Sequence, residues 1–139
     1  MKSDSVKLFT VGEANKELPR ITDLVKRLRE VKAMLEKQEV QIDALELVTE
    51  TRETGNARNE LSEKVSSYND LVQEFYDHID EINAVGCVLK DLEIGLIDFY
   101  SLYDDRIVFL CWQVGEEKVE HWHEIGSGFI HRQPVRSNK

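Results

Sequence analysis

The sequence contains few of the residues that interrupt regular structure. Its 139 residues include two prolines, seven glycines and two cysteines. Proline and glycine mark most turns and loops, so their scarcity argues against long irregular linkers. A chain of this length fits one domain over residues 1–139.

Long apolar runs and an excess of positive charge are also absent. No stretch has the roughly 18 apolar residues that a membrane-spanning helix needs. The opening MKSDS is not followed by the apolar segment of a signal peptide. The net charge of −9 opposes binding to nucleic acids and anionic membranes, since both require clustered lysines and arginines. We therefore expect a cytoplasmic protein that binds neither nucleic acid nor membrane.

The two cysteines, Cys87 and Cys111, each lie within an apolar run. They form neither a CxxC motif nor the spacing of a zinc finger. This placement predicts two buried, reduced thiols. A catalytic thiolate at Cys111 is the alternative, although no neighbouring residue in the sequence supports it.

The start of the chain predicts a short helix over residues 8–18. Thr10 and Glu13 have the spacing of a capping box. Pro19 should end this helix, because proline has no backbone N–H and restricts the residue before it. A second helix is then expected over residues 19–50, with proline in its first turn.

Apolar residues at alternating spacings of three and four, here called the seam, recur through residues 21–82 and predict two long helices. The helices should span residues 19–50 and 57–85 and fold back as an antiparallel coiled-coil hairpin, with turn and N-cap residues at Gly55 and Asn56. The seam comprises Ile21, Leu24, Leu28, Val31, Leu35, Gln38, Ile42 and Leu45, then Leu61, Val65, Tyr68, Val72, Phe75, Ile79 and Ile82.

Further apolar residues lie off the seam and need cover from elsewhere. They are Val25, Val40, Val48, Leu71 and Tyr76. Either the C-terminal part or a second subunit would supply that cover. The seam and these flanks therefore predict a homo-oligomer, most simply a dimer, or binding to a partner helix.

After Gly86, a natural residue to end a helix, the pattern becomes that of β-strands. Residues 87–130 should form a small antiparallel sheet, followed by a polar tail at residues 132–139. We expect strands at residues 87–93, 94–99, 107–114 and 119–125, with a turn at Asp104–Asp105. The predicted fold class is therefore α+β.

Several motifs, in this order, resemble the bacterial family catalogued as domain of unknown function 2203. They are Phe9–Asn15 with Leu18–Pro19, Gly86–Asp91, Gly95–Phe99, Leu110–Trp112, His121–Glu124, Gly128–Phe129 and Arg132–Pro134. The resemblance covers nearly the whole chain. It implies a fold and a bacterial cytosolic setting, and it implies no activity.

His121 and His123 form the most informative local pattern. In an extended segment their side chains share one face, where two imidazoles can bind a metal ion. A third ligand would come from Asp91, Glu93 or Asp98, and such a set suits zinc, manganese or iron. The alternative is that both histidines pack between Val119 and Ile125 with ordinary hydrogen bonds.

Two functions follow, and the first is favoured. It is a structural or interaction module that self-associates through its helical hairpin. The alternative is a metal-binding protein, of which a hydrolase is one form, with its site on the β-rich part. No phosphate loop, dinucleotide-binding motif or nucleophile elbow is present. An enzyme is therefore disfavoured, and no cofactor is predicted beyond the divalent transition metal of the alternative.

Overall fold

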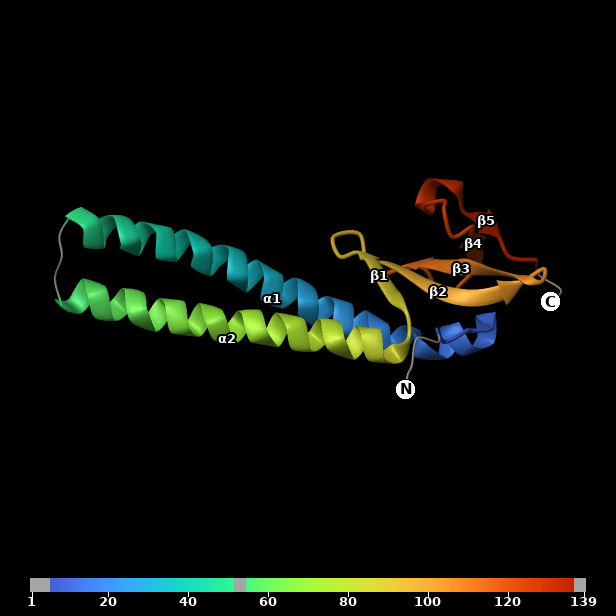
Figure 1. Cartoon of the computed structure of the whole chain (residues 1–139), viewed down its shortest axis with the longest axis horizontal. Helices are drawn as coiled ribbons and strands as arrows, with labels where there is room; N and C mark the ends of the chain where they lie inside the picture. The colour runs from blue at the N-terminus through green and yellow to red at the C-terminus, as the bar shows by residue number, and fades with distance from the viewer. Residues whose placement is uncertain (1–5, 52–54, 137–139) are drawn as a thin grey trace. The chain divides into compact units, whose positions relative to one another are not determined.

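The computed structural model describes residues 6–51 and 55–136 of the chain. Two long helices packed against each other precede a five-stranded antiparallel sheet, so the fold is α+β, as predicted (Figure 1). The elements are α1 (Val11–Thr51), α2 (Gly55–Val85), β1 (Val88–Asp91), β2 (Leu96–Tyr103), β3 (Arg106–Gln113), β4 (His121–His123), the 3₁₀ helix η1 (Phe129–His131) and β5 (Gln133–Pro134). Within the described ranges, no helix combines the length and apolar character that crossing a bilayer demands.

Helix α1 continues through Pro19, so the predicted break between helices 8–18 and 19–50 is wrong. The predicted capping box is present: the Thr10 N–H donates to Glu13 Oε1 at 2.9 Å, and the Glu13 N–H donates to Thr10 Oγ1 at 3.1 Å. An internal proline costs a helix about 3 kcal/mol. Leu18 and Ile21 are buried on either side of it, and this packing offsets the cost.

Helix α2 ends where glycine was expected to end it. Gly86 has a φ of 103°, a left-handed conformation that favours glycine, and its N–H donates to the Asn83 carbonyl at 3.0 Å. At the other end, Gly55 and Asn56 belong to the helix rather than to a preceding turn. The connection at residues 52–54 lies outside the described residues.

The chain divides into two compact units. The first, here called the sheet unit, comprises the residues up to Val25 and from Asp80 onward. The second, the hairpin unit, is Lys26–Ile79. The helices therefore contribute to both units.

The sheet is a meander in which each strand pairs with its neighbours in sequence, in the order β1-β2-β3-β4-β5. The predicted turn at Asp104–Asp105 joins β2 to β3, and both residues have positive φ angles of 51° and 65°. This pair of angles suits the right-handed twist of a two-residue hairpin loop. The strand predicted at residues 94–99 starts only at Leu96 and continues to Tyr103, because Gly95 closes the β1–β2 turn with a φ of 70°. The strands predicted at residues 87–93 and 119–125 are shorter, at Val88–Asp91 and His121–His123, and the predicted tail from residue 132 contains β5.

One face of the sheet packs on the start of α1, seen in dark blue in Figure 1. The Phe9 ring meets the Phe99 ring edge-on, with centroids 5.1 Å apart. The Phe9 N–H donates to the Tyr100 carbonyl at 2.7 Å, and Ser101 Oγ donates to the Phe9 carbonyl at 2.6 Å. The core behind these contacts is Ala14, Leu18, Ile21, Ile97, Phe99, Val108, Leu110 and Trp112.

The hairpin unit consists of the two antiparallel helices alone. Gln38 Nε2 donates to Ser67 Oγ at 3.4 Å, and the Tyr68 hydroxyl donates to Glu39 Oε2 at 2.7 Å. Among the described residues between 32 and 79, no side chain is buried. The apolar seam of this unit is therefore only partly removed from water.

Candidate functional site

Polar side chains gather on the sheet face opposite Phe99 and Leu110. The strand register places Asp98 opposite Cys111, Cys111 opposite His121, and Phe109 opposite His123. Residues two apart on a strand share a face, so side chains from β2, β3 and β4 meet there.

Three of these residues form a compact group, here called the Asp98–Cys111–His123 cluster. Their side chains are almost fully buried, with 1%, 0% and 2% of their surface exposed. Each offers one ligand atom, and these atoms all lie within 4.8 Å of one another. In the part of the chain that the structure describes, this is the one such group of three or more histidine, cysteine or acidic residues.

Both ring nitrogens of His123 have partners. Nδ1 lies 2.8 Å from the Glu124 carbonyl oxygen, and Nε2 lies 3.0 Å from Asp98 Oδ2. A carbonyl only accepts, so Nδ1 carries a hydrogen, and one further proton is shared between Nε2 and Asp98. The other carboxylate oxygen, Asp98 Oδ1, is buried without a hydrogen-bond partner.

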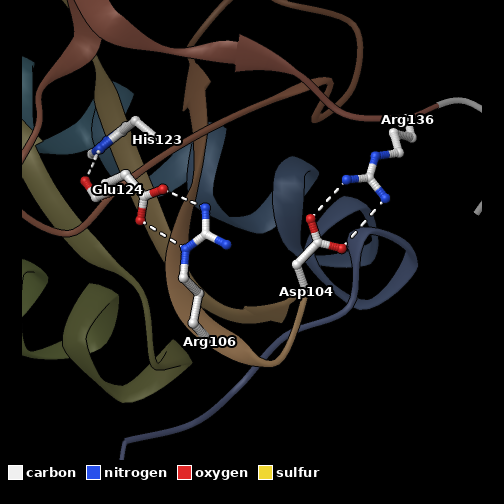
Figure 2. Close-up of polar contacts among 5 residues, drawn as sticks. All are labelled: Asp104, Arg106, His123, Glu124 and Arg136. Atoms are coloured by element: carbon white, nitrogen blue, oxygen red, sulfur yellow. Dashed lines mark hydrogen bonds and ion pairs between the residues drawn. The ribbon is translucent and has the colours of Figure 1, made fainter.

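The Glu124 side chain anchors the same strand end (Figure 2). Its carboxylate accepts a hydrogen bond from Arg106 Nε at 3.1 Å and a second from Arg106 Nη2. The Glu124 carbonyl meanwhile receives the His123 Nδ1–H. This arrangement fixes the backbone beside His123 and thereby the direction of its ring. The hydrogen bond and the charge of Arg106 lower the pKa of Glu124.

Two cations border the cluster. Lys90 Nζ lies 3.5 Å from Asp98 Oδ2 and 4.3 Å from the centre of the Phe109 ring. Arg132 interacts with Cys111. Burial raises the pKa of the Cys111 thiol to about 12, with the nearby Asp98 adding to the rise and Arg132 opposing it. Cys111 is therefore a protonated thiol at neutral pH.

Arg132 is itself held by the connection between β3 and β4. It donates to Glu116 Oε1 at 3.1 Å and to Oε2 at 2.6 Å, and its guanidinium lies 4.4 Å from the centre of the Phe129 ring. Burial alone would raise the pKa of Glu116. Hydrogen bonds from Arg132 and from the Gln113 N–H outweigh burial, so this pKa is lowered. The ion pair between Arg132 and Glu116 thus holds the C-terminal segment against the sheet unit.

The structure brings together only part of the predicted ligand set. Asp98 and His123 meet in the cluster, while His121 lies outside it, with its buried Nδ1 lacking a hydrogen-bond partner. Asp91 and Glu93 are exposed and lie outside the cluster. The register shifts between Leu89 and Asp91, and Asp91 Oδ1 instead accepts the Ile94 N–H at 3.2 Å in the turn that follows.

Cys111 is the member of the cluster that sequence reasoning missed. Its apolar neighbours predicted a buried thiol, and it is buried. What the sequence does not show is the register that sets Cys111 beside Asp98. The sequence offered one signal: Cys111 lies two residues from Phe109 in a clearly predicted strand, so the two side chains share a face of the sheet.

A pocket of about 840 Å³ opens elsewhere in the sheet unit. Its lining includes the start of α1 at Thr10–Gly12, the β2–β3 turn and the C-terminal segment with Arg136. Arg136 is paired with Asp104, donating at 2.7 Å and 3.3 Å (Figure 2). Asp98, Cys111 and His123 do not line this pocket.

The predicted interface residues fall into three classes of exposure. Ile21, Leu24, Leu28 and Val31 are buried. Val65 is exposed. Leu35, Leu61, Tyr68, Val72 and Phe75 are half-buried.

Comparison with known proteins adds one finding. A family model described as uncharacterized conserved protein (DUF2203) matches residues 7–135. No curated protein and no solved structure matches the chain.

Proposed function

Since the chain belongs to the DUF2203 family of uncharacterized conserved proteins, a description that assigns no activity, we propose from the structure that it is an interaction module. It self-associates through the hairpin unit, with a second copy of the chain as its partner.

One observation carries this proposal: no described side chain between residues 32 and 79 is buried. Two helices form a single layer, and a stable core normally needs a second layer on its apolar side. The hairpin unit also exposes large apolar side chains, namely Met34 at 49%, Val40 at 69%, Val65 at 38% and Tyr76 at 57%. A second hairpin would complete a four-helix bundle over these residues.

The free energy that a dimer would gain is comparable with the cost of association. Burying one large apolar side chain contributes about 1.5–3 kcal/mol. Partly exposed residues gain less, but a symmetric dimer buries each of them twice. The sum is of the same order as the roughly 4–15 kcal/mol that association costs.

Charge favours an antiparallel dimer. Residues 39–50 of α1 carry four acidic residues and no basic one, whereas residues 26–37 carry five basic and two acidic residues. Parallel hairpins would place two acidic segments side by side, where like charges repel. Antiparallel hairpins keep the acidic segments apart.

Sedimentation equilibrium over a wide concentration range tests the proposal. Val40 and Val65 lie at the same level of the hairpin, since each is two residues from the hydrogen-bonded pair Gln38 and Ser67. We expect a dimer, and a Val40→Asp/Val65→Asp variant that dissociates at least about a hundredfold more readily, because each copy would place two charges in the interface.

Leu102→Asp serves as the matched control, since Leu102 is 60% exposed but belongs to the sheet unit. Circular dichroism should show unchanged helix content in both variants. A wild-type chain that stays monomeric at the highest concentration would overturn the proposal. So would equal dissociation in the Leu102 variant.

A further inference from the structure

We propose that Asp98, Cys111 and His123 bind one divalent transition metal ion of the zinc class inside the sheet. This site is independent of self-association, because all three residues belong to the sheet unit.

The ligand set matches the preference of zinc for sulfur, imidazole nitrogen and carboxylate oxygen. Tetrahedral coordination at ordinary bond lengths separates ligand atoms by roughly 3.5 Å. The three atoms already lie within 4.8 Å of one another. Small side-chain rotations would bring them onto a common ion, and the sheet backbone need not move.

A second observation points to a ligand. Asp98 Oδ1 is buried and has no hydrogen-bond partner, although Asp98 is only 1% exposed. An unsatisfied buried polar atom costs about 1–3 kcal/mol, and more when the group is charged. A metal ion beside this oxygen would remove that cost.

The surroundings of His123 already resemble those of a metal ligand. Ligating histidines usually donate their second ring N–H to a carbonyl or carboxylate, which fixes the tautomer. His123 Nδ1 does this toward the Glu124 carbonyl at 2.8 Å. Nε2 is therefore the ligand atom, aimed at Asp98.

Binding must displace two protons. One is the Cys111 thiol proton, and the other is the proton shared by His123 Nε2 and Asp98 Oδ2. Both pass to water. The thiolate and the carboxylate then carry two negative charges, which neutralise the divalent ion in a site that excludes solvent.

The cations Lys90 and Arg132 should influence which metal ion binds. Their charges oppose any metal ion, so affinity must come from the sulfur and nitrogen ligands. Zinc and cobalt should therefore bind, and magnesium and calcium, which prefer oxygen ligands, should not. Replacing Lys90, whose Nζ lies 3.5 Å from Asp98 Oδ2, should tighten binding.

Cobalt titration of the full chain, stripped of metal with a chelator, tests the site. We expect one Co²⁺ per chain with a thiolate-to-cobalt absorption band, reversed by Zn²⁺ and unaffected by Mg²⁺. Cys111→Ser should abolish the band, and Cys87→Ser, a change at the other buried thiol, should keep it. His123→Gln and Asp98→Asn should weaken binding at least about tenfold, whereas His121→Gln should not.

Lys90→Met is a further test that does not depend on changing a buried residue. The Lys90 side chain is 36% exposed, so this variant should fold even where the variants of the buried ligands do not. It should bind Co²⁺ roughly tenfold more tightly, because one repelling charge is lost. Absence of the band in the folded wild-type chain would overturn the proposal. A band that survives Cys111→Ser but disappears with Cys87→Ser would overturn it as well.

Discussion

The same apolar periodicity has different results in the two units. In the sheet unit, Ile21 and Ile82 are completely buried. In the hairpin unit, Leu35, Val72 and Phe75 follow the same spacing and remain half-exposed. The helices are continuous, so propensity does not explain the difference. What differs is the number of layers: only the sheet unit supplies a second one. Periodicity thus identifies the apolar side of a helix but not what covers it.

The largest expected effect comes from truncating matched phenylalanines. Phe99→Ala in the sheet unit should lower the free energy of unfolding by about 3–5 kcal/mol, because Phe99 is fully buried. Phe75→Ala in the half-buried hairpin seam should cost about half as much at low protein concentration. Urea unfolding measures both. If both variants lost the same free energy of unfolding in dilute solution, the proposed difference between the sheet unit and the hairpin unit would be wrong.

The second-largest difference between the units is expected when a carboxylate of an ion pair is removed from each. The lowered pKa of Glu116 means that its ionised form stabilises the fold. This stabilisation is present above the unfolded-state pKa of 4.5 and is lost as pH falls through the lower folded-state value. Glu116→Gln should therefore cost about 1.5–3 kcal/mol at pH 7, and the difference from wild type should shrink below pH 4.5.

Glu74→Gln is the counterpart in the hairpin unit. Glu74 lies 3.5 Å from His78, and its side chain is 53% exposed. Exposed pairs contribute about 0–1 kcal/mol, so this variant should unfold almost as wild type does at pH 7. Urea unfolding at a series of pH values checks both variants. If Glu74→Gln lost as much free energy of unfolding at pH 7 as Glu116→Gln, the predicted difference between the two ion pairs would be wrong.

Glycines provide the smallest test. Gly86→Ala in the sheet unit should destabilise by about 1–2 kcal/mol. Its φ is 103°, and an added Cβ would lie 3.2 Å from Lys7 Cβ. Gly55→Ala in the hairpin unit meets no atom within 4 Å and should be neutral or stabilise by up to about 1 kcal/mol. Thermal unfolding measures both, and a change of the same sign in the two would contradict the prediction.

Local features of the fold were predictable from sequence. Both long helices, the capping box at Thr10 and Glu13, the helix end at Gly86 and the turn at Asp104–Asp105 all depend on neighbouring residues. Pro19 misled the prediction because packing against other segments outweighs a local preference. The strand ends were inexact for a related reason, since pairing partners decide where a strand stops.

The candidate site was less accessible to sequence reasoning. Asp98 and His123 were proposed as ligands from the spacing of the two histidines along one strand and from the acidic residues of the neighbouring strand segments, and they do meet. Asp91 and Glu93 were equally plausible by type, but the register shift and the turn after β1 leave them exposed. Cys111 joins the cluster through cross-strand pairing. A pattern read along one strand carries no information about such a neighbour.

The hydrogen bond from Ser101 to the Phe9 carbonyl joins residues 92 positions apart. In a flexible chain, closing a loop of that length would cost about 4 kcal/mol in entropy. Most of the intervening chain consists of the two antiparallel helices, and once they pair, the ends of the loop are already close. Formation of the hairpin thus lowers the entropic cost of bringing residues 9 and 101 into contact. We expect it to form before the sheet closes on Phe9, and the slowest folding step to follow rather than precede helix pairing.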